Sequence, residues 1–154
     1  NLFSTMPLKE TIYYFYKQQL QDKINHVQLI LQELSQSAAN ETKSTAGDKH
    51  ETALAMLQLE QENKRKQLNE LRLQQQQFEK IDPTIVSPYI LNGSLIKTDQ
   101  GYFFVSISLC KMLLEDKIIF ALSPLSPLGK KMMGHKPSDI IELNGKVYNI
   151  LTVE

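Results

Sequence analysis

Apolar residues recur every three or four positions through the first half of the chain. One stripe runs through Tyr13, Tyr16, Leu20, Ile24, Val27, Leu31, Leu34 and Ala38. A second stripe runs through Leu54, Leu57, Gln61, Lys64, Leu68, Leu71, Gln75 and Phe78. Steps that alternate between three and four residues predict two helices that pack along a coiled-coil seam.

The two stripes fit one another as the arms of an antiparallel hairpin. In such a hairpin, residues that face each other have numbers with a constant sum. Four pairs along the stripes share the sum 91: Leu34 with Leu57, Val27 with Lys64, Leu20 with Leu71, and Tyr13 with Phe78. The chain then reverses between Thr45 and Ala46. We predict an antiparallel coiled-coil hairpin over residues 6–81, with helices ~45 Å long and a tip near residues 41–51.

A different pattern begins after the hairpin. Asp82-Pro83 and Ser87-Pro88 disfavour helix at the residue before each proline, so residues 82–88 are predicted to form a linker. The segments that follow are rich in β-branched and aromatic residues, and the predicted strands are GSLIKT, YFFVSISL, KIIFALS, DIIEL and KVYNILTV. Asn144-Gly145 between the last two is a strong hairpin signal.

One short helix is expected among these strands. Ser126 is suited to the N-cap, Pro127 to the first helical position and Gly134 to the stop. The fold class is therefore α+β: a long helical hairpin, then a small domain over residues 89–154 with a twisted antiparallel sheet. Because so short a segment buries only a modest core, we expect it to dock on the base of the hairpin.

Composition narrows the function classes. The 154 residues include 17 basic and 17 acidic side chains, which argues against a strongly basic nucleic-acid-binding surface. The lone Cys110 lies in an apolar run and is expected to be a buried, inert thiol. No apolar run is long enough to span a membrane, so a cytoplasmic protein is expected. NLFST does not resemble a natural start, so we expect residues 1–5 to be an artificial extension before Met6.

Two carboxylates, Asp48 and Glu51, lie beside the predicted reversal. Their spacing resembles a capping box, which satisfies the first free amides of a helix and suits the helix dipole. Acids on one turn at the end of a long arm have a second use. Carboxylate oxygens suit Mg²⁺, but two alone hold it weakly, so such a tip would best complete a metal site in another macromolecule.

The sequence resembles the bacterial Gre transcript cleavage factors, GreA and GreB, from Met6 to its end. The tip motif of that family is approximately Gly-Asp-x-x-Glu-Asn-Ala-Glu-Tyr. Gly47, Asp48, Glu51 and Ala53 match it, whereas Thr52, Leu54 and Ala55 depart from it. SPLGKKMMGHKPSD resembles the family's Ser-Pro-Ile-Gly-(Lys/Arg)-Ala-Leu-(Leu/Ile)-Gly-Lys-x-x-Gly-Asp through Ser126, Pro127, Gly129, Lys130, Gly134 and Asp139.

The resemblance implies an FKBP-like C-terminal domain and an accessory factor that is not itself an enzyme. The globular domain would bind RNA polymerase at the rim of its secondary channel, through Ser126, Pro127, Gly129 and Lys130. The coiled coil would enter the channel, where Asp48 and Glu51 would act as catalytic ligands of the second Mg²⁺ and orient a water. The polymerase would then cleave backtracked RNA by its own two-metal chemistry. We expect a monomer that binds no cofactor alone.

Three alternatives stay open. Ala55 and Leu54 stand where the family has tyrosine and an acid, so a homologue that occupies the channel and inhibits or modulates polymerase without promoting cleavage is the first. A prolyl isomerase is the second, although the sequence lacks signs of the aromatic-lined cleft that this chemistry needs. A purely structural coiled coil, in which the two acids only cap a helix, is the third.

Overall fold

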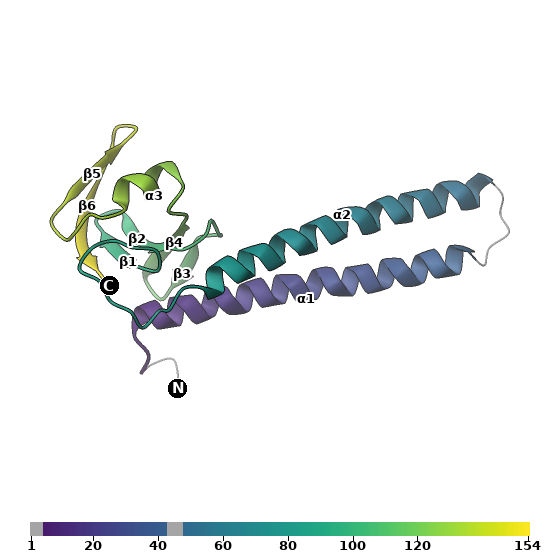
Figure 1. Ribbon diagram of the computed structural model, residues 1–154, viewed down its shortest axis with the longest axis horizontal. Coiled ribbons are helices and arrows are strands. Elements are labelled where there is room, and N and C mark those ends of the chain that lie inside the picture. The colour runs from purple at the N-terminus through teal and green to yellow at the C-terminus, as the bar shows by residue number, and fades with distance from the viewer. Residues whose placement is uncertain (1–4, 43–47) are drawn as a thin grey trace. The chain divides into compact units, whose positions relative to one another are not determined.

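A computed structural model describes residues 5–42 and 48–154, and the side chains of residues 42 and 48–50 lie outside the described part. Its elements are α1 (Leu8–Thr42), α2 (Asp48–Glu79), β1 (Leu95–Thr98), β2 (Gly101–Val105), β3 (Met112–Leu114), β4 (Lys117–Leu122), α3 (Pro127–Met132), β5 (Ile140–Leu143) and β6 (Lys146–Val153). A helical hairpin followed by a sheet and a short helix confirms the predicted α+β layout (Figure 1).

The chain divides into two compact units. Residues Tyr16–Gln76 form one, which we call the hairpin unit. The segments Asn1–Phe15 and Gln77–Glu154 form the other, the globular unit. The globular unit thus contains the first turns of α1 and the last residues of α2 in addition to the sheet.

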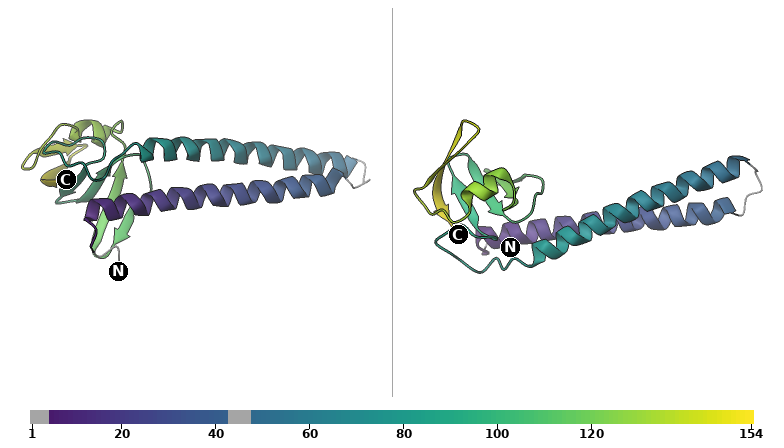
Figure 2. Two further views of the ribbon diagram at one scale, coloured as in Figure 1. Left: turned by 60° about the horizontal axis from the view of Figure 1, so that its bottom comes forward. Right: turned by 45° about the horizontal axis from the view of Figure 1, so that its top comes forward.

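Within the hairpin unit, α1 and α2 run side by side, and the two views of Figure 2 agree on this arrangement. Ile24, Val27 and Leu68 are buried together, and Leu31 and Leu71 pack against them. Gln75 Nε2 donates a hydrogen bond to Gln21 Oε1 across the two helices (2.9 Å). These contacts follow the predicted seam. The predicted reversal between Thr45 and Ala46 lies outside the described residues.

The globular unit is built on a six-stranded sheet with the order β3-β4-β2-β1-β6-β5. All neighbouring strands are antiparallel except β2 and β4, which are parallel. The sheet is therefore mostly, not wholly, antiparallel, and this corrects the prediction. The parallel pair arises because β3, a short strand that the sequence did not predict, turns the chain back before β4.

Turn residues explain both hairpins at the edges of the sheet. Asn144 and Gly145 have φ values of 53° and 78°, as a two-residue type I′ turn requires, so the predicted β5–β6 hairpin is confirmed. Glu115 has a φ of 56° in the turn between β3 and β4. Glutamate is uncommon in this left-handed region, which is why the sequence offered no turn signal there.

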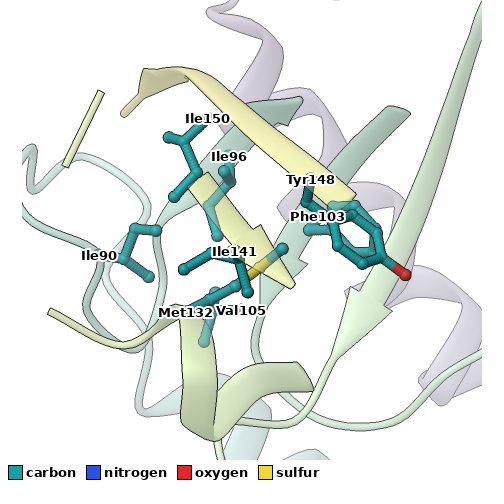
Figure 3. Packing of buried hydrophobic residues seen from close by; sticks show 8 residues of the cluster. All are labelled: Ile90, Ile96, Phe103, Val105, Met132, Ile141, Tyr148 and Ile150. Atoms are coloured by element: carbon teal, nitrogen blue, oxygen red, sulfur yellow. The ribbon is translucent and has the colours of Figure 1, made fainter. Parts of the chain in front are cut away.

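A buried apolar cluster lies between α3 and one face of the sheet (Figure 3). Its members are Ile90, Ile96, Phe103, Val105, Met132, Ile141, Tyr148 and Ile150. Met132 from α3 is fully buried among side chains from the strands. The rings of Phe103 and Tyr148 meet edge to face, with centroids 5.7 Å apart. This cluster fixes α3 on the sheet.

Aromatic side chains occupy the opposite face of the sheet. Phe104 points to that face from β2 and meets Phe78 edge to face, with ring centroids 6.1 Å apart. Phe78 in turn stacks on Tyr13, at 4.9 Å between centroids. The predicted pairing of Tyr13 with Phe78 is confirmed, and within the globular unit Phe104 packs on the end of α2.

Lys9 fastens the segment after α2 to the start of α1. Its side chain is buried, and its Nζ donates a hydrogen bond to the backbone carbonyl of Ile85 (2.6 Å). Burial lowers the pKa of Lys9, while the nearby Glu154 and Asp82 oppose that shift. Residues 82–88 contain no helix or strand, so this hydrogen bond helps to hold an otherwise irregular segment in place.

Cys110 is exposed rather than buried, so the prediction for this thiol was wrong. The apolar run around it was expected to continue a strand, but β2 ends at Val105 and the chain bends through residues 106 and 107. Cys110 consequently lies in an irregular segment at the surface. Among the helices as described, none is long and apolar enough to cross a membrane.

Candidate functional site

The predicted acidic pair lies in the first turn of α2. The helix begins at Asp48, and Glu51 follows three residues later with an exposed side chain. Residues three apart on a helix project to neighbouring positions. Glu51 precedes Gln76, the last residue of the hairpin unit, by 25 helical positions, or ~38 Å along the axis. The acids are thus at one end of the hairpin unit.

The start of a helix is a favourable place for these carboxylates. Unpaired backbone amides and the helix dipole give this end a partial positive charge, which stabilises acids in the first turn. The side chain of Asp48 and all of Gly47 lie outside the described residues. Among the side chains that the structure describes, which exclude those of residues 48–50, no three from histidine, cysteine or acidic residues are grouped as a metal site. Two carboxylates alone fill few of the positions of Mg²⁺, which keeps the others for water, phosphate or ligands of a partner.

The second predicted segment forms the start of α3. Ser126 is its N-cap: the Ser126 Oγ accepts a hydrogen bond from the Gly129 amide (3.1 Å) and donates one to the Ser123 carbonyl (2.6 Å). Pro127 takes the first helical position, where a missing amide proton costs nothing. Both predicted roles are confirmed, and both are structural.

Gly129 has a steric reason to be glycine. A Cβ added at this position would lie 2.0 Å from the Ser123 carbonyl oxygen and 2.9 Å from the Ser126 Oγ. Two backbone segments approach each other closely here, and only a residue without a side chain fits between them. The match to the Gre motif at Gly129 therefore reflects how the chain packs and does not by itself indicate a binding surface.

The turn between α3 and β5 contains the other matching residues. Gly134 has a φ of 81° and donates its amide to the Ile90 carbonyl (2.8 Å). The Asp139 Oδ2 accepts the Lys136 amide (3.0 Å) and lies 2.9 Å from the His135 Nδ1. These hydrogen bonds, first that of the Lys136 amide, lower the pKa of Asp139 to about 2. Gly134 and Asp139 thus organise the turn.

The side chains available to a partner at this segment are Pro127 and Lys130, which are exposed. Leu125 adds to them: it is 78% exposed, and our reading of the sequence missed it. A sequence signal was present. An apolar residue before an N-cap commonly packs on the fourth helical position, which is Lys130 here, so Leu125 has no apolar partner there. This surface lies in the globular unit, and the acids lie in the hairpin unit.

Comparisons with protein-family models, with curated proteins and with solved structures give no match. The function of the chain must therefore be inferred from its own residues and geometry.

Proposed function

We propose that this protein is a transcription elongation factor of the Gre type. It binds RNA polymerase through the secondary channel and stimulates cleavage of backtracked RNA by the polymerase. The factor has no active site of its own. In this proposal the globular unit has an FKBP-like fold and binds at the channel rim, while the hairpin unit presents its acids to the active centre of the polymerase.

The exposure of Glu51 in the first turn of α2 is the main support for this function. A hairpin of two helices leaves most of its surface exposed to solvent and buries only a small core. It does carry a terminal side chain far from the other end, here ~38 Å. An acid that only capped a helix would gain nothing from that distance.

The acids and the metal have separate roles in the proposed complex. Asp48 and Glu51 would supply hard oxygen ligands to a Mg²⁺ that the polymerase also binds, and they would orient a water through hydrogen bonds. The metal, when bound, supplies electrostatic stabilisation of the phosphoryl oxygens. Two carboxylates leave most positions of Mg²⁺ for water, phosphate and polymerase ligands.

The start of α3 supplies the proposed contact with the channel rim. Leu125, Pro127 and Lys130 form the exposed surface. Ser126 and Gly129 hold that surface in place through the N-cap and the close approach to Ser123. A mixed apolar and basic surface suits a partner helix with apolar and acidic side chains.

The decisive experiment compares wild type with Asp48→Ala/Glu51→Ala on backtracked transcription complexes. We expect the double variant to bind polymerase and to release few short 3′ RNA fragments. Glu70→Ala is the matched control, because it removes an exposed carboxylate from the same helix. Equal cleavage by wild type and the double variant would remove these acids from the mechanism, and failure of wild type to bind polymerase would refute the function.

An inhibitor that occupies the same channel is the second candidate. Ala55 is exposed one turn after Glu51 and offers no polar group where the family has tyrosine. Such a factor would slow elongation without releasing 3′ fragments, so the same assay identifies it.

The same variants also separate the remaining alternatives. A purely structural coiled coil predicts a loss of about 1 kcal/mol of helix stability per lost cap and no effect on polymerase. Turnover in a protease-coupled peptide assay would instead indicate a prolyl isomerase.

A further inference from the structure

The half of the hairpin unit nearest the acids, residues 28–42 and 48–62, is here called the distal half. Among its described side chains only that of Gln61 is buried, and no apolar one is. The buried cluster of this unit lies entirely in the other half, around Ile24, Val27 and Leu68. The distal half is therefore a pair of helices with an incomplete core, able to gain burial from a third element.

An open hollow of about 550 Å³ lies along α2 in the distal half. It is lined by Ala53, Met56, Leu57, Leu59, Glu60 and Asn63. Met56 is 67% exposed and Leu59 is 60% exposed, although both are large apolar side chains. Their spacing places these residues on one side of the helix, beside the predicted seam that runs through Leu57. A helix of another chain fits such a stripe through side chains at i, i+3, i+4 and i+7.

Charge indicates what kind of helix could bind there. The distal half contains six acids and one lysine, Lys49, and the acids are Glu33, Glu41, Asp48, Glu51, Glu60 and Glu62. The other half has the opposite sign, with six basic and two acidic residues in 16–27 and 63–76. Glu60 lines the hollow itself. A basic partner is attracted to this half, whereas a second copy that bound through its own distal half would place acids against Glu60.

We propose that the distal half of α2 is a docking surface for a basic amphipathic helix of a partner protein. The apolar face of that helix covers Met56 and Leu59, and its lysine or arginine flank faces Glu60. The contact centres on Met56, Leu59 and Glu60 and uses neither Asp48 nor Glu51, because it binds a protein helix and needs no metal. The proposed function enters only in the identity of the partner, which would then be RNA polymerase.

A synthetic helical peptide of about 15 residues tests the surface directly. It has leucines at i, i+3, i+4 and i+7 and lysines on both flanks, and a second peptide has glutamates in place of the lysines. We expect the lysine peptide to bind wild type and the glutamate peptide to bind at least about tenfold more weakly. Affinity should fall as salt rises from about 0.05 M to about 0.3 M.

Met56→Lys/Leu59→Lys is the informative variant, because it removes the apolar contact and adds like charge. We expect it to weaken the lysine peptide by at least about tenfold. Leu73→Lys is the matched control: Leu73 is also on α2 and is 60% exposed, but it lies outside the hollow. Circular dichroism should show equal helix content in all three proteins, since lysine is a good helix former.

Three results would overturn the docking surface. The first is equal affinity of the lysine peptide for wild type and the double variant. The second is no binding, or equal binding of both peptides. The third is concentration-dependent dimerisation of the free protein that Met56→Lys/Leu59→Lys abolishes, because a second copy would then cover the surface.

A photocrosslinker at position 56, with position 73 as control, then asks whether polymerase supplies the helix. We expect the adduct from position 56 to map to a basic helical segment of polymerase. If wild type binds the lysine peptide but not polymerase, the proposed function fails while the docking surface stands. If polymerase binds but position 56 gives no adduct and the double variant binds equally well, the docking surface fails alone.

Discussion

The two units of this protein use apolar side chains in opposite ways. In the globular unit, eight buried residues form one cluster between α3 and the sheet. In the hairpin unit, the buried cluster has three residues and lies in one half, and the distal half leaves Met56 and Leu59 in solvent. Burial of apolar side chains stabilises a fold, whereas their exposure on a rigid helix is a cost that a partner can remove.

The residues that match the Gre motifs show the same difference. Ser126, Gly129 and Asp139 are each explained by a contact within the globular unit. Glu51 is exposed, and helix capping is its only structural use apparent from the sequence. A motif match in the globular unit is therefore evidence mainly about backbone geometry, and a match at the tip is evidence mainly about chemistry. Substitutions should consequently change stability in the globular unit and activity at the tip.

The largest expected effect separates two neighbouring residues of α3. Gly129→Ala should lower the free energy of unfolding by about 3 kcal/mol or more, because its Cβ would overlap the Ser123 carbonyl. Lys130→Ala should change it by less than about 0.5 kcal/mol, because this side chain is exposed. Urea denaturation followed by circular dichroism measures both. A Gly129→Ala protein as stable as wild type would show that the motif glycine is not held by packing.

The same methionine-to-alanine substitution can be made in each unit, at Met132 and at Met56, to compare how well each side chain is packed. Met132→Ala should lower the free energy of unfolding by about 3 kcal/mol, because it leaves a cavity in the buried cluster. Met56→Ala removes a side chain that is 67% exposed and should cost less than about 0.5 kcal/mol. Binding of the lysine peptide should show the reverse order, with a loss for Met56→Ala alone. Equal stability losses would mean that the distal half is better packed than its exposure indicates.

Much of the fold follows from local signals. The three-and-four spacing predicted both long helices, and the constant sum of facing residues paired Tyr13 with Phe78. Asn144-Gly145 specified the last hairpin, because both residues adopt positive φ readily. Ser126 and Pro127 specified the start of α3 for a similar local reason.

The missed features depend on distant residues. Lys9 is buried because its partner carbonyl belongs to Ile85, 76 positions away, and nothing near Lys9 indicates that contact. The parallel pairing of β2 with β4 and the short strand β3 are likewise settled by the sheet as a whole. At the candidate site, the residue types could be predicted from the sequence. Which of them hold the backbone in place and which are exposed to a partner could not. Gly129 is required only because Ser123 approaches it.

The smallest expected effect is on the free energy of unfolding, which a serine-to-glycine change should raise at position 138 and lower at position 35. Ser138 in the globular unit has a φ of 79°, and the Gre pattern has glycine at this position. Ser138→Gly should raise the free energy of unfolding by about 0.5 kcal/mol, because relief of left-handed strain exceeds the entropy that glycine loses.

Ser35 is exposed on α1 with ordinary helical geometry. Ser35→Gly should lower the free energy of unfolding by about 0.5 kcal/mol, because glycine is the poorer helix former. The chemical change is identical in the two variants, so the sign reports only the backbone of each unit. Thermal and urea unfolding of both proteins, each beside wild type, measure it. Two losses of similar size would show that the turn before Asp139 holds no strain that glycine can relieve.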